Sequence, residues 1–199
     1  MPYSDSMIKF YPQIISEQNR KEIYSTFLHM VLNDQSKYFE GKTEALMVNG
    51  VGRGFGVYSL PITLKEIDKF IPIIENDFGN FYEFTHSYLR IYPNNSVLHP
   101  HIDRVGLDLT LSVNIYCSEN TYWPLIISNT RVSSDHPEFC ADINDKHFMD
   151  NYGVDSTAYN FLPGDGACCT REHPHWRPFY TMAFEGDHYM QCFYHWKLK

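Results

Sequence analysis

The segment HPHIDR at 99–104 places two side chains that commonly bind metals, His101 and Asp103, on alternate positions. In a β-strand, residues i and i+2 point to the same face of the sheet. The imidazole and the carboxylate would then converge at about the separation of metal ligands. A solvated strand end is the simpler explanation of an isolated HxD pair, so the case for a metal depends on a third ligand.

Two candidates for the third ligand lie in NFLPGDGACCTREHPHWRPFY at 160–180, where a strand that follows a Pro-Gly turn ends near His173 and His175. Two histidines and a carboxylate form the facial triad of non-haem Fe(II) oxygenases, which keeps positions open for substrate and O2. Zinc hydrolases also use two histidines and a carboxylate, but they commonly present them as HExxH on a helix. That motif is absent from this sequence.

Composition restricts the partners. The chain has 199 residues, with 16 basic against 24 acidic side chains and a formal net charge of -8. This balance disfavours nucleic acid, whose binding requires a basic surface, and it leaves small anions open as ligands. The five cysteines show no CxxC spacing, which favours a reduced, cytoplasmic setting. No apolar run approaches the ~18 residues of a membrane span, and the oligomeric state stays undetermined.

The first third of the chain has helical patterns. Ser16 is an expected N-cap for a helix in SEQNRKEIYSTFLHMVLN, with apolar residues at helical spacing. Thr63 and Glu66 have capping-box spacing at the start of a second helix, which Pro72 is expected to kink or end. The alternate glycines at 50–56 do not match a dinucleotide-binding pattern, and we interpret them as a mobile loop or a poor edge strand.

After residue 84 the pattern changes to short aromatic or β-branched segments separated by turns. We predict a mainly β fold with N-terminal helices, in which the strands form a jelly roll. A single domain is expected over 1–199, with a helical or mixed support layer at 1–83 and a jelly-roll core at 84–199. The polar segment 129–156 is expected to be an insertion in that core.

Three segments carry a family resemblance, LRIYPNNSVLHPHIDRVGLDLTLSVNIYCSENTYWPL, LPGDGACCTREHPHWRP and GDHYMQCFYHW. In this order they resemble the Fe(II)/2-oxoglutarate-dependent dioxygenase superfamily, more narrowly its prolyl-hydroxylase-like branch. The resemblance covers about residues 84–196 and implies a double-stranded β-helix, which is a jelly-roll variant. It also implies Fe(II) as metal, 2-oxoglutarate as cosubstrate and O2 as oxidant, with ascorbate as a candidate reductant.

Carried over by residue, the resemblance makes His101, Asp103 and His175 the iron ligands. His173 is the rival of His175, which is preferred because it directly precedes Trp-Arg, as in many members of the family. His99 is expected to lie at the rim of the site or to support a ligand, and not to bind the metal itself. A cupin is the other metal-binding alternative, but it expects a glutamate shortly after HxH, and Arg104 and Val105 follow the motif here.

The expected anchor for the far carboxylate of 2-oxoglutarate departs from the family pattern. The last strand begins with His188, where better-known members have an arginine or a lysine. Arg177 could grip a carboxylate instead, and a contact from His188 with Tyr116 is the other solution. Arg177 as a structural ion-pair residue stays an alternative. Tyr92 matches a family tyrosine near the cosubstrate. The alternative is that Tyr92 is simply a buried aromatic residue of a strand.

The implied reaction is hydroxylation of an unactivated C–H bond, with release of succinate and CO2. Related halogenases have Gly or Ala in place of the carboxylate, so Asp103 favours hydroxylation. The substrate is expected to be a small molecule or an amino-acid or peptidyl side chain. Two alternatives remain, a jelly-roll metalloenzyme that does not use 2-oxoglutarate, such as an isomerase or lyase, and a non-catalytic binding module.

Overall fold

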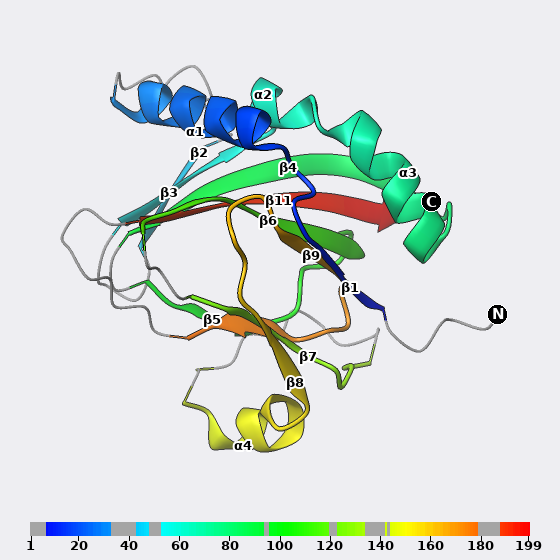
Figure 1. Ribbon diagram of the computed structural model, residues 1–199. Coiled ribbons are helices and arrows are strands. Elements are labelled where there is room, and N and C mark those ends of the chain that lie inside the picture. Colours follow the sequence, from blue (N-terminus) through cyan, green and yellow to red (C-terminus); the bar gives the residue numbers. More distant parts are fainter. Residues whose placement is uncertain are drawn as a thin grey trace.

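Two antiparallel β-sheets face each other in the computed structural model, which describes residues 7–32, 43–47, 53–93, 96–119, 123–133, 142, 144–178 and 188–199 (Figure 1). The larger sheet contains, in spatial order, β1 (Ile8–Tyr11), β9 (Gly166–Thr170), β6 (Leu109–Cys117), β11 (His188–Leu198), β4 (Tyr82–Pro93), β3 (Arg53–Tyr58) and β2 (Thr43–Met47). The smaller sheet contains β5 (Leu98–His101), β10 (His175–Arg177), β7 (Leu125–Ser128) and β8 (Ser156–Tyr159). From β4 onward the chain crosses repeatedly between the sheets, as in a jelly roll.

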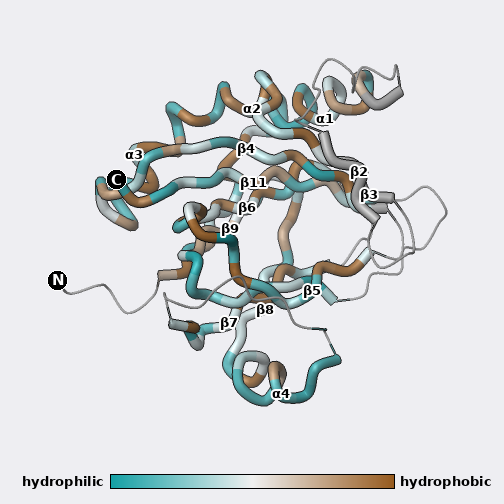
Figure 2. Tube along the Cα trace, turned by 180° about the vertical axis from the view of Figure 1, so that it is seen from behind, coloured by the Kyte–Doolittle hydropathy of each residue, from teal (hydrophilic) through white to brown (hydrophobic). Residues whose placement is uncertain are grey.

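Helices cover the outer face of the larger sheet, as both views of the chain show (Figures 1 and 2). They are α1 (Glu17–Leu32), α2 (Pro61–Leu64) and α3 (Ile67–Phe78). Their apolar residues, such as Phe27 and Phe70, are buried against alternate residues of β6 and β11, among them Leu111 and Tyr194. Because alternate strand residues point to opposite faces, the other half of each strand faces the smaller sheet. The predicted mainly β fold with N-terminal helices is confirmed.

Of the two helix predictions, the one for the N-cap of the first helix is confirmed, and the one for the second helix is not. Ser16 is the N-cap of α1, since its Oγ accepts a hydrogen bond from the backbone N–H of Asn19 at 3.3 Å. The predicted capping box and a helix end at Pro72 are wrong. Thr63 lies inside α2 and donates its hydroxyl to the carbonyl of Leu60, and α3 continues through Pro72 to Phe78. Pro72 therefore lies in the interior of α3, where it removes one backbone donor of the helix.

The glycine-rich segment is partly a strand. Residues 53–58 form β3, which lies between β2 and β4, while residues 48–52 lie outside the described residues. Gly56 packs against Tyr88 of β4 so closely that a Cβ at this position would overlap the phenol ring. The glycine is therefore explained by the close approach of an aromatic ring, as glycines within strands often are.

The segment 129–156 contributes to the far side of the smaller sheet. Its described part contains a short helix, α4 (Lys146–Phe148), and a π-helical turn (Met149–Gly153), and residues 134–141 and 143 are outside the described residues. Phe148 packs edge-on against Trp176, with ring centroids 5.5 Å apart. This contact covers the outer face of β10. Among the described residues, no helix is long and apolar enough to cross a membrane.

Candidate metal centre

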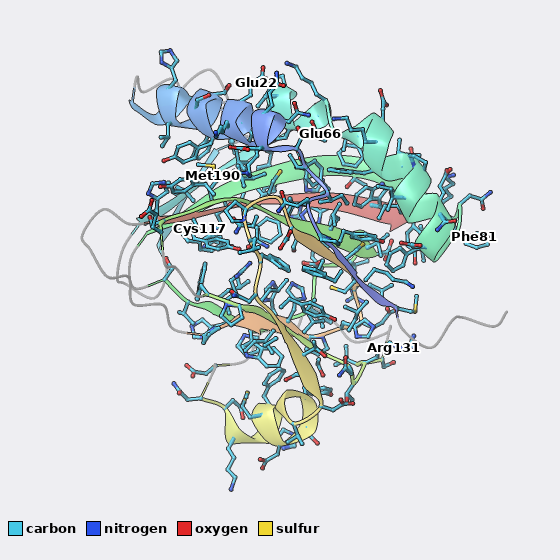
Figure 3. The ribbon with its side chains drawn as sticks, in the orientation of Figure 1. Glu22, Glu66, Phe81, Cys117, Arg131 and Met190 are labelled. Atoms are coloured by element: carbon cyan, nitrogen blue, oxygen red, sulfur yellow. The ribbon has the colours of Figure 1, made fainter. Side chains whose placement is uncertain are left out.

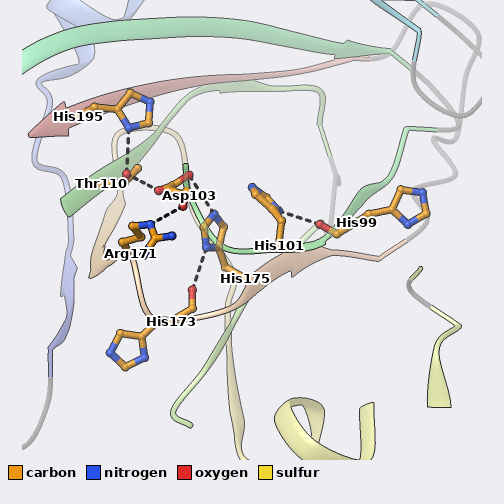
Figure 4. Close-up of polar contacts among 8 residues, drawn as sticks. All are labelled: His99, His101, Asp103, Thr110, Arg171, His173, His175 and His195. Atoms are coloured by element: carbon orange, nitrogen blue, oxygen red, sulfur yellow. Dashed lines mark hydrogen bonds and ion pairs between the residues drawn. The ribbon is translucent and has the colours of Figure 1, made fainter. Parts of the chain in front are cut away.

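His101, Asp103 and His175 come together beside the smaller sheet (Figure 4). His101 is the last residue of β5 and His175 is the first of β10, and the antiparallel register pairs them directly. Asp103 follows β5 by two residues. One donor atom from each side chain lies within 4.8 Å of the other two. Pairing of β5 with β10 therefore builds the three-residue site that the sequence predicted.

Hydrogen bonds on the far side of each imidazole fix which nitrogen faces the centre. Nδ1 of His101 lies 2.8 Å from the carbonyl oxygen of His99, and Nδ1 of His175 lies 3.1 Å from that of His173. A carbonyl oxygen only accepts, so Nδ1 carries the hydrogen and Nε2 keeps its lone pair. Metal-binding histidines are held in this way, and both rings are prepared as ligands through Nε2.

The Asp103 carboxylate has one oxygen engaged and one directed toward the histidines. Its Oδ2 accepts a hydrogen bond from the Thr110 hydroxyl at 2.6 Å. Its Oδ1 lies 4.0 Å from Nε2 of His175. The backbone carbonyl of Asp103 also accepts a hydrogen bond from Nε of Arg171 at 2.9 Å. The aspartate is thus fixed at both its backbone and its side chain.

The charge state of the site suits a metal cation. Burial lowers the pKa of His101 to about 4, with a further contribution from His175. Burial alone would raise the pKa of Asp103, but the nearby histidines and the Thr110 hydrogen bond lower it. At neutral pH the site therefore offers a neutral His101 imidazole and an ionised carboxylate, which are the forms that bind metal. A donor set of this kind fits Fe(II).

The two neighbouring histidines are placed differently. Nδ1 of His173 lies 2.8 Å from the carbonyl oxygen of Ser128, and this hydrogen bond holds the ring on the other side of the strand end. The ring of His99 is directed away from the three ligands in Figure 4. Both residues contribute their carbonyls, which accept the Nδ1 hydrogens of His175 and His101. The preference for His175 over His173 agrees with this geometry.

Arg177 is fully buried between the two sheets. Its guanidinium donates to the backbone carbonyl of Trp123, to the Tyr189 hydroxyl at 3.3 Å and to Oε1 of Gln191 at 2.9 Å. It also lies over the ring of Tyr189, 4.6 Å from the centroid. No carboxylate among the described residues pairs with it, since none of their ion pairs includes Arg177. A buried cation without a counter-ion is costly, so this position suits an anionic ligand.

Several buried polar atoms near Arg177 have no hydrogen-bond partner among the described residues. We call these residues the polar cluster, and the unpaired atoms are Arg90 Nε, Tyr92 OH, Asn114 Oδ1, Arg177 Nε and Gln191 Nε2. Arg90 and Gln191 are paired in register on β4 and β11, and Gln191 is paired with Asn114 on β6. Buried polar atoms are normally satisfied, so the polar cluster indicates a polar ligand between the sheets.

Tyr116 and His188 lie on the helix side of the larger sheet, opposite to the triad. Tyr116 stacks on Tyr24 of α1 with centroids 4.3 Å apart, and Nε2 of His188 lies 3.0 Å from the Tyr24 hydroxyl. Regular strand alternation would turn Tyr116 inward, toward a cosubstrate, but β6 has a β-bulge. Met190 pairs with Tyr116 and Gln191 with Asn114, so Ile115 is an extra residue that reverses the alternation.

Figure 3 allows the reader to follow the two faces at this end of the sheet. Met190 points toward α1, and Cys117 points toward the smaller sheet. His188 shares the face of Met190, two residues away on β11. His188 and Tyr116 thus lie in the α1 interface, and the expected contact of these two residues with a cosubstrate is not supported.

Comparison with known proteins rests on structure. No family model matches the sequence, and no curated protein matches it. The epimerase SnoN, in complex with Fe3+, alpha ketoglutarate and nogalamycin RO, aligns with a TM-score of 0.69 at 10% identity, over 98% of this chain and 80% of its own. The non-heme alpha ketoglutarate dependent carbocyclase SnoK aligns with a TM-score of 0.68 at 12% identity, over 98% of this chain and 81% of its own. A Pseudomonas putida prolyl-4-hydroxylase aligns with a TM-score of 0.60 at 10% identity, over 96% of this chain and 92% of its own.

The chain has the double-stranded β-helix fold of the Fe(II)/2-oxoglutarate-dependent oxygenases. The resemblance seen in the sequence is thus confirmed at the level of the fold. Because an epimerase, a carbocyclase and a hydroxylase share this oxygenase fold, the fold leaves the type of reaction open.

Among the residues of the site that were not predicted from the sequence are Thr110, His195 and Gln191. Each lies in the interior of a predicted strand, and a polar residue there looks like any other member of an alternating pattern. The only signal was the polar composition of one strand face, with Thr110, Ser112 and Asn114 alternating with apolar residues on β6. In the structure this polar face lies toward the smaller sheet and the three candidate metal ligands.

Proposed function

We propose that the protein is an Fe(II)/2-oxoglutarate-dependent oxygenase that acts on a small molecule. The observation that carries the proposal is the triad of His101, Asp103 and His175, with both rings presenting Nε2 and the carboxylate presenting one free oxygen. The fold supports it, since SnoN and SnoK are both described as enzymes associated with alpha ketoglutarate. When bound, the metal and 2-oxoglutarate would supply the oxidising chemistry, with succinate and CO2 as products.

Arg177 is the proposed partner of the far carboxylate of 2-oxoglutarate. It shares a strand face with His175, from which it is separated by one residue on β10. A carboxylate would neutralise the buried guanidinium, and the unpaired Nε of Arg177 and Nε2 of Gln191 are donors suited to it. The carboxylate anchor would then come from the smaller sheet, whereas the family places it on the last strand.

Tyr92 and Trp123 are proposed to form the apolar side of the cosubstrate site. Both are buried, and their rings meet edge to face with centroids 5.0 Å apart. Trp123 and Tyr189 also flank the Arg177 guanidinium, at 4.9 Å and 4.6 Å from their ring centroids. Such surroundings exclude water and strengthen the attraction between the guanidinium and a carboxylate. Arg90, which lies over the Tyr92 ring at 4.4 Å, is the second cation on this side of the sheet.

Hydroxylation of an unactivated C–H bond is the proposed outcome. The Asp103 carboxylate occupies the position that related halogenases leave for chloride, and this supports hydroxylation over halogenation. SnoN was crystallised with nogalamycin RO, and that precedent supports a small-molecule substrate for this chain. The chain's own residues would then position the substrate carbon and keep water from the metal.

Conversion of 2-oxoglutarate to succinate tests the proposal without knowledge of the substrate. Purified protein with Fe(II), ascorbate, O2 and 2-oxoglutarate is expected to form succinate slowly, and His101→Ala is expected to form none. Succinate formation that is equal in His101→Ala would contradict the proposal. Metal binding by the wild type without any succinate would favour a metalloenzyme that does not use 2-oxoglutarate.

A further inference from the structure

Two hydrogen bonds, one buried and one partly buried, connect the Asp103 carboxylate to the last strand of the larger sheet. The Thr110 hydroxyl lies 2.6 Å from Oδ2 of Asp103 and 2.9 Å from Nδ1 of His195 (Figure 4). Thr110 is 2% exposed and His195 is 6% exposed, so the bond between them is shielded from water. The connection runs from β11 through β6 to the loop that follows β5.

The chemistry of the three groups fixes the direction of both bonds. An ionised carboxylate only accepts, so Thr110 gives its single hydroxyl hydrogen to Asp103. The threonine oxygen must then accept from His195, which places the hydrogen of His195 on Nδ1. With Asp103 ionised, the row is satisfied in one arrangement, in which Nδ1–H of His195 donates to Thr110 and the Thr110 hydroxyl donates to Asp103.

The register of the larger sheet holds Thr110 and His195 rigidly. Thr110 and His195 are paired opposite each other on β6 and β11. The backbone carbonyl of His195 accepts the hydroxyl of Thr85 from β4 at 2.9 Å. The His195 ring lies between Phe193 and His86, with centroids 6.2 Å and 4.9 Å away. Both residues thus belong to the rigid interior of the larger sheet and not to a loop.

We propose that Thr110 and His195 are positioning residues that hold Asp103 as a one-oxygen metal ligand. By engaging Oδ2, Thr110 leaves Oδ1 to face the histidines, 4.0 Å from Nε2 of His175. His195 acts through Thr110 by fixing the orientation of its hydroxyl. This inference rests on the proposed function, because it concerns the same metal site. A carboxylate that binds through one oxygen keeps further metal positions open for other ligands.

The test is Co(II) binding to metal-free protein, followed by the visible d–d absorption of the bound ion. Thr110→Val keeps the shape of the side chain and removes the hydroxyl, and it is expected to weaken Co(II) binding about 10- to 100-fold, the usual effect of losing such a supporting contact. Its d–d spectrum is expected to change because the carboxylate gains freedom to bind through both oxygens. Thr110→Ser restores the hydroxyl and is expected to bind within about threefold of wild type.

Thr170→Val is the matched control. Thr170 is also 2% exposed and lies on the adjacent strand β9, but its hydroxyl has no hydrogen-bond partner among the described residues. Its removal is expected to leave the affinity and spectrum of Co(II) unchanged. His195→Phe retains a buried ring and is expected to weaken Co(II) binding less than Thr110→Val does.

The outcomes separate this inference from the proposed function. Wild-type protein that binds no Co(II) would remove the metal site and the inference with it. Wild-type binding with an equal affinity and spectrum in Thr110→Val would overturn the inference alone. Far-ultraviolet circular dichroism of each metal-free variant checks the fold, and His195→Phe supplies the answer if Thr110→Val does not fold. An unchanged Co(II) affinity and spectrum in a folded His195→Phe would also count against the inference.

Discussion

The guanidinium of Arg177 donates a hydrogen bond to Oε1 of Gln191 at 2.9 Å, and this contact joins the smaller sheet to the larger one. Arg177 is buried. It forms no ion pair with a carboxylate of the described residues. A charge in this situation stabilises a protein poorly on its own. Its presence is best explained by a bound anion, which leads to the first prediction.

Arg177→Met is expected to weaken 2-oxoglutarate binding strongly while leaving the protein folded. Methionine has a similar length and no charge, so the loss of hydrogen bonds to Trp123 and Gln191 is offset by the removal of a buried cation. We expect the affinity of the Ni(II)-loaded protein for 2-oxoglutarate to fall about 100-fold or more, close to 3 kcal/mol. Isothermal titration calorimetry measures this affinity. An unchanged affinity would show that the carboxylate anchor lies elsewhere, and Arg90→Gln is the companion variant for that case.

His188→Phe is expected to leave 2-oxoglutarate affinity unchanged. The His188 ring stacks on Tyr116 at 4.8 Å and on Tyr24 at 5.8 Å, beneath α1, and phenylalanine keeps this stacking. The hydrogen bond to the Tyr24 hydroxyl is lost, at a cost of about 1 kcal/mol in unfolding free energy. The same calorimetric titration checks the affinity. A loss as large as that of Arg177→Met would return the anchor to the last strand.

Acidification is expected to destabilise the metal-free protein between pH 7 and pH 5. Burial lowers the pKa values of His101 and His195 to about 4, below the ordinary value of 6.5 that the unfolded chain has. The unfolded state therefore binds protons first as the pH falls below 6.5, and unfolding becomes more favourable until the folded pKa values are reached. The slope is at most about 1.4 kcal/mol per pH unit for each histidine.

Urea unfolding at pH 7, 6 and 5 measures this slope. His195→Phe removes one of the two groups, so its stability is expected to depend less on pH than that of the wild type. A free energy of unfolding that is constant or rises toward pH 5 would contradict the burial of neutral histidines in this site.

Gly56→Ala is expected to destabilise the fold by about 1–3 kcal/mol, the usual cost of overpacking. A Cβ at residue 56 would overlap the phenol of Tyr88, which β4 holds against β3. Replacement of Tyr88 by leucine in the same chain should recover part of the loss, because the overlapping ring atoms are removed. Thermal unfolding of the two single variants and the double variant tests the coupling, and additive effects would contradict the contact.

The sequence predicted those parts of the structure that depend on local pattern. The short aromatic and β-branched segments predicted strands after residue 84, among which is β6 (Leu109–Cys117), and the HxD spacing located two candidate ligands. What it missed depends on tertiary structure. The bulge at Ile115 turns Tyr116 toward α1, and nothing in NIYC distinguishes a bulged strand from a regular one. Thr110 and His195 are 85 residues apart, so only the pairing of β6 with β11 reveals their contact.

The central claim is that His101, Asp103 and His175 bind iron together with 2-oxoglutarate. It is tested most directly by anaerobic titration of metal-free protein with Fe(II) and 2-oxoglutarate, followed by the visible charge-transfer band of the chelate. The band is expected in the wild type and in His173→Ala, and it is expected to be absent in His175→Ala. Iron binding by the wild type without the band, or a band that survives in His175→Ala, would contradict the claim.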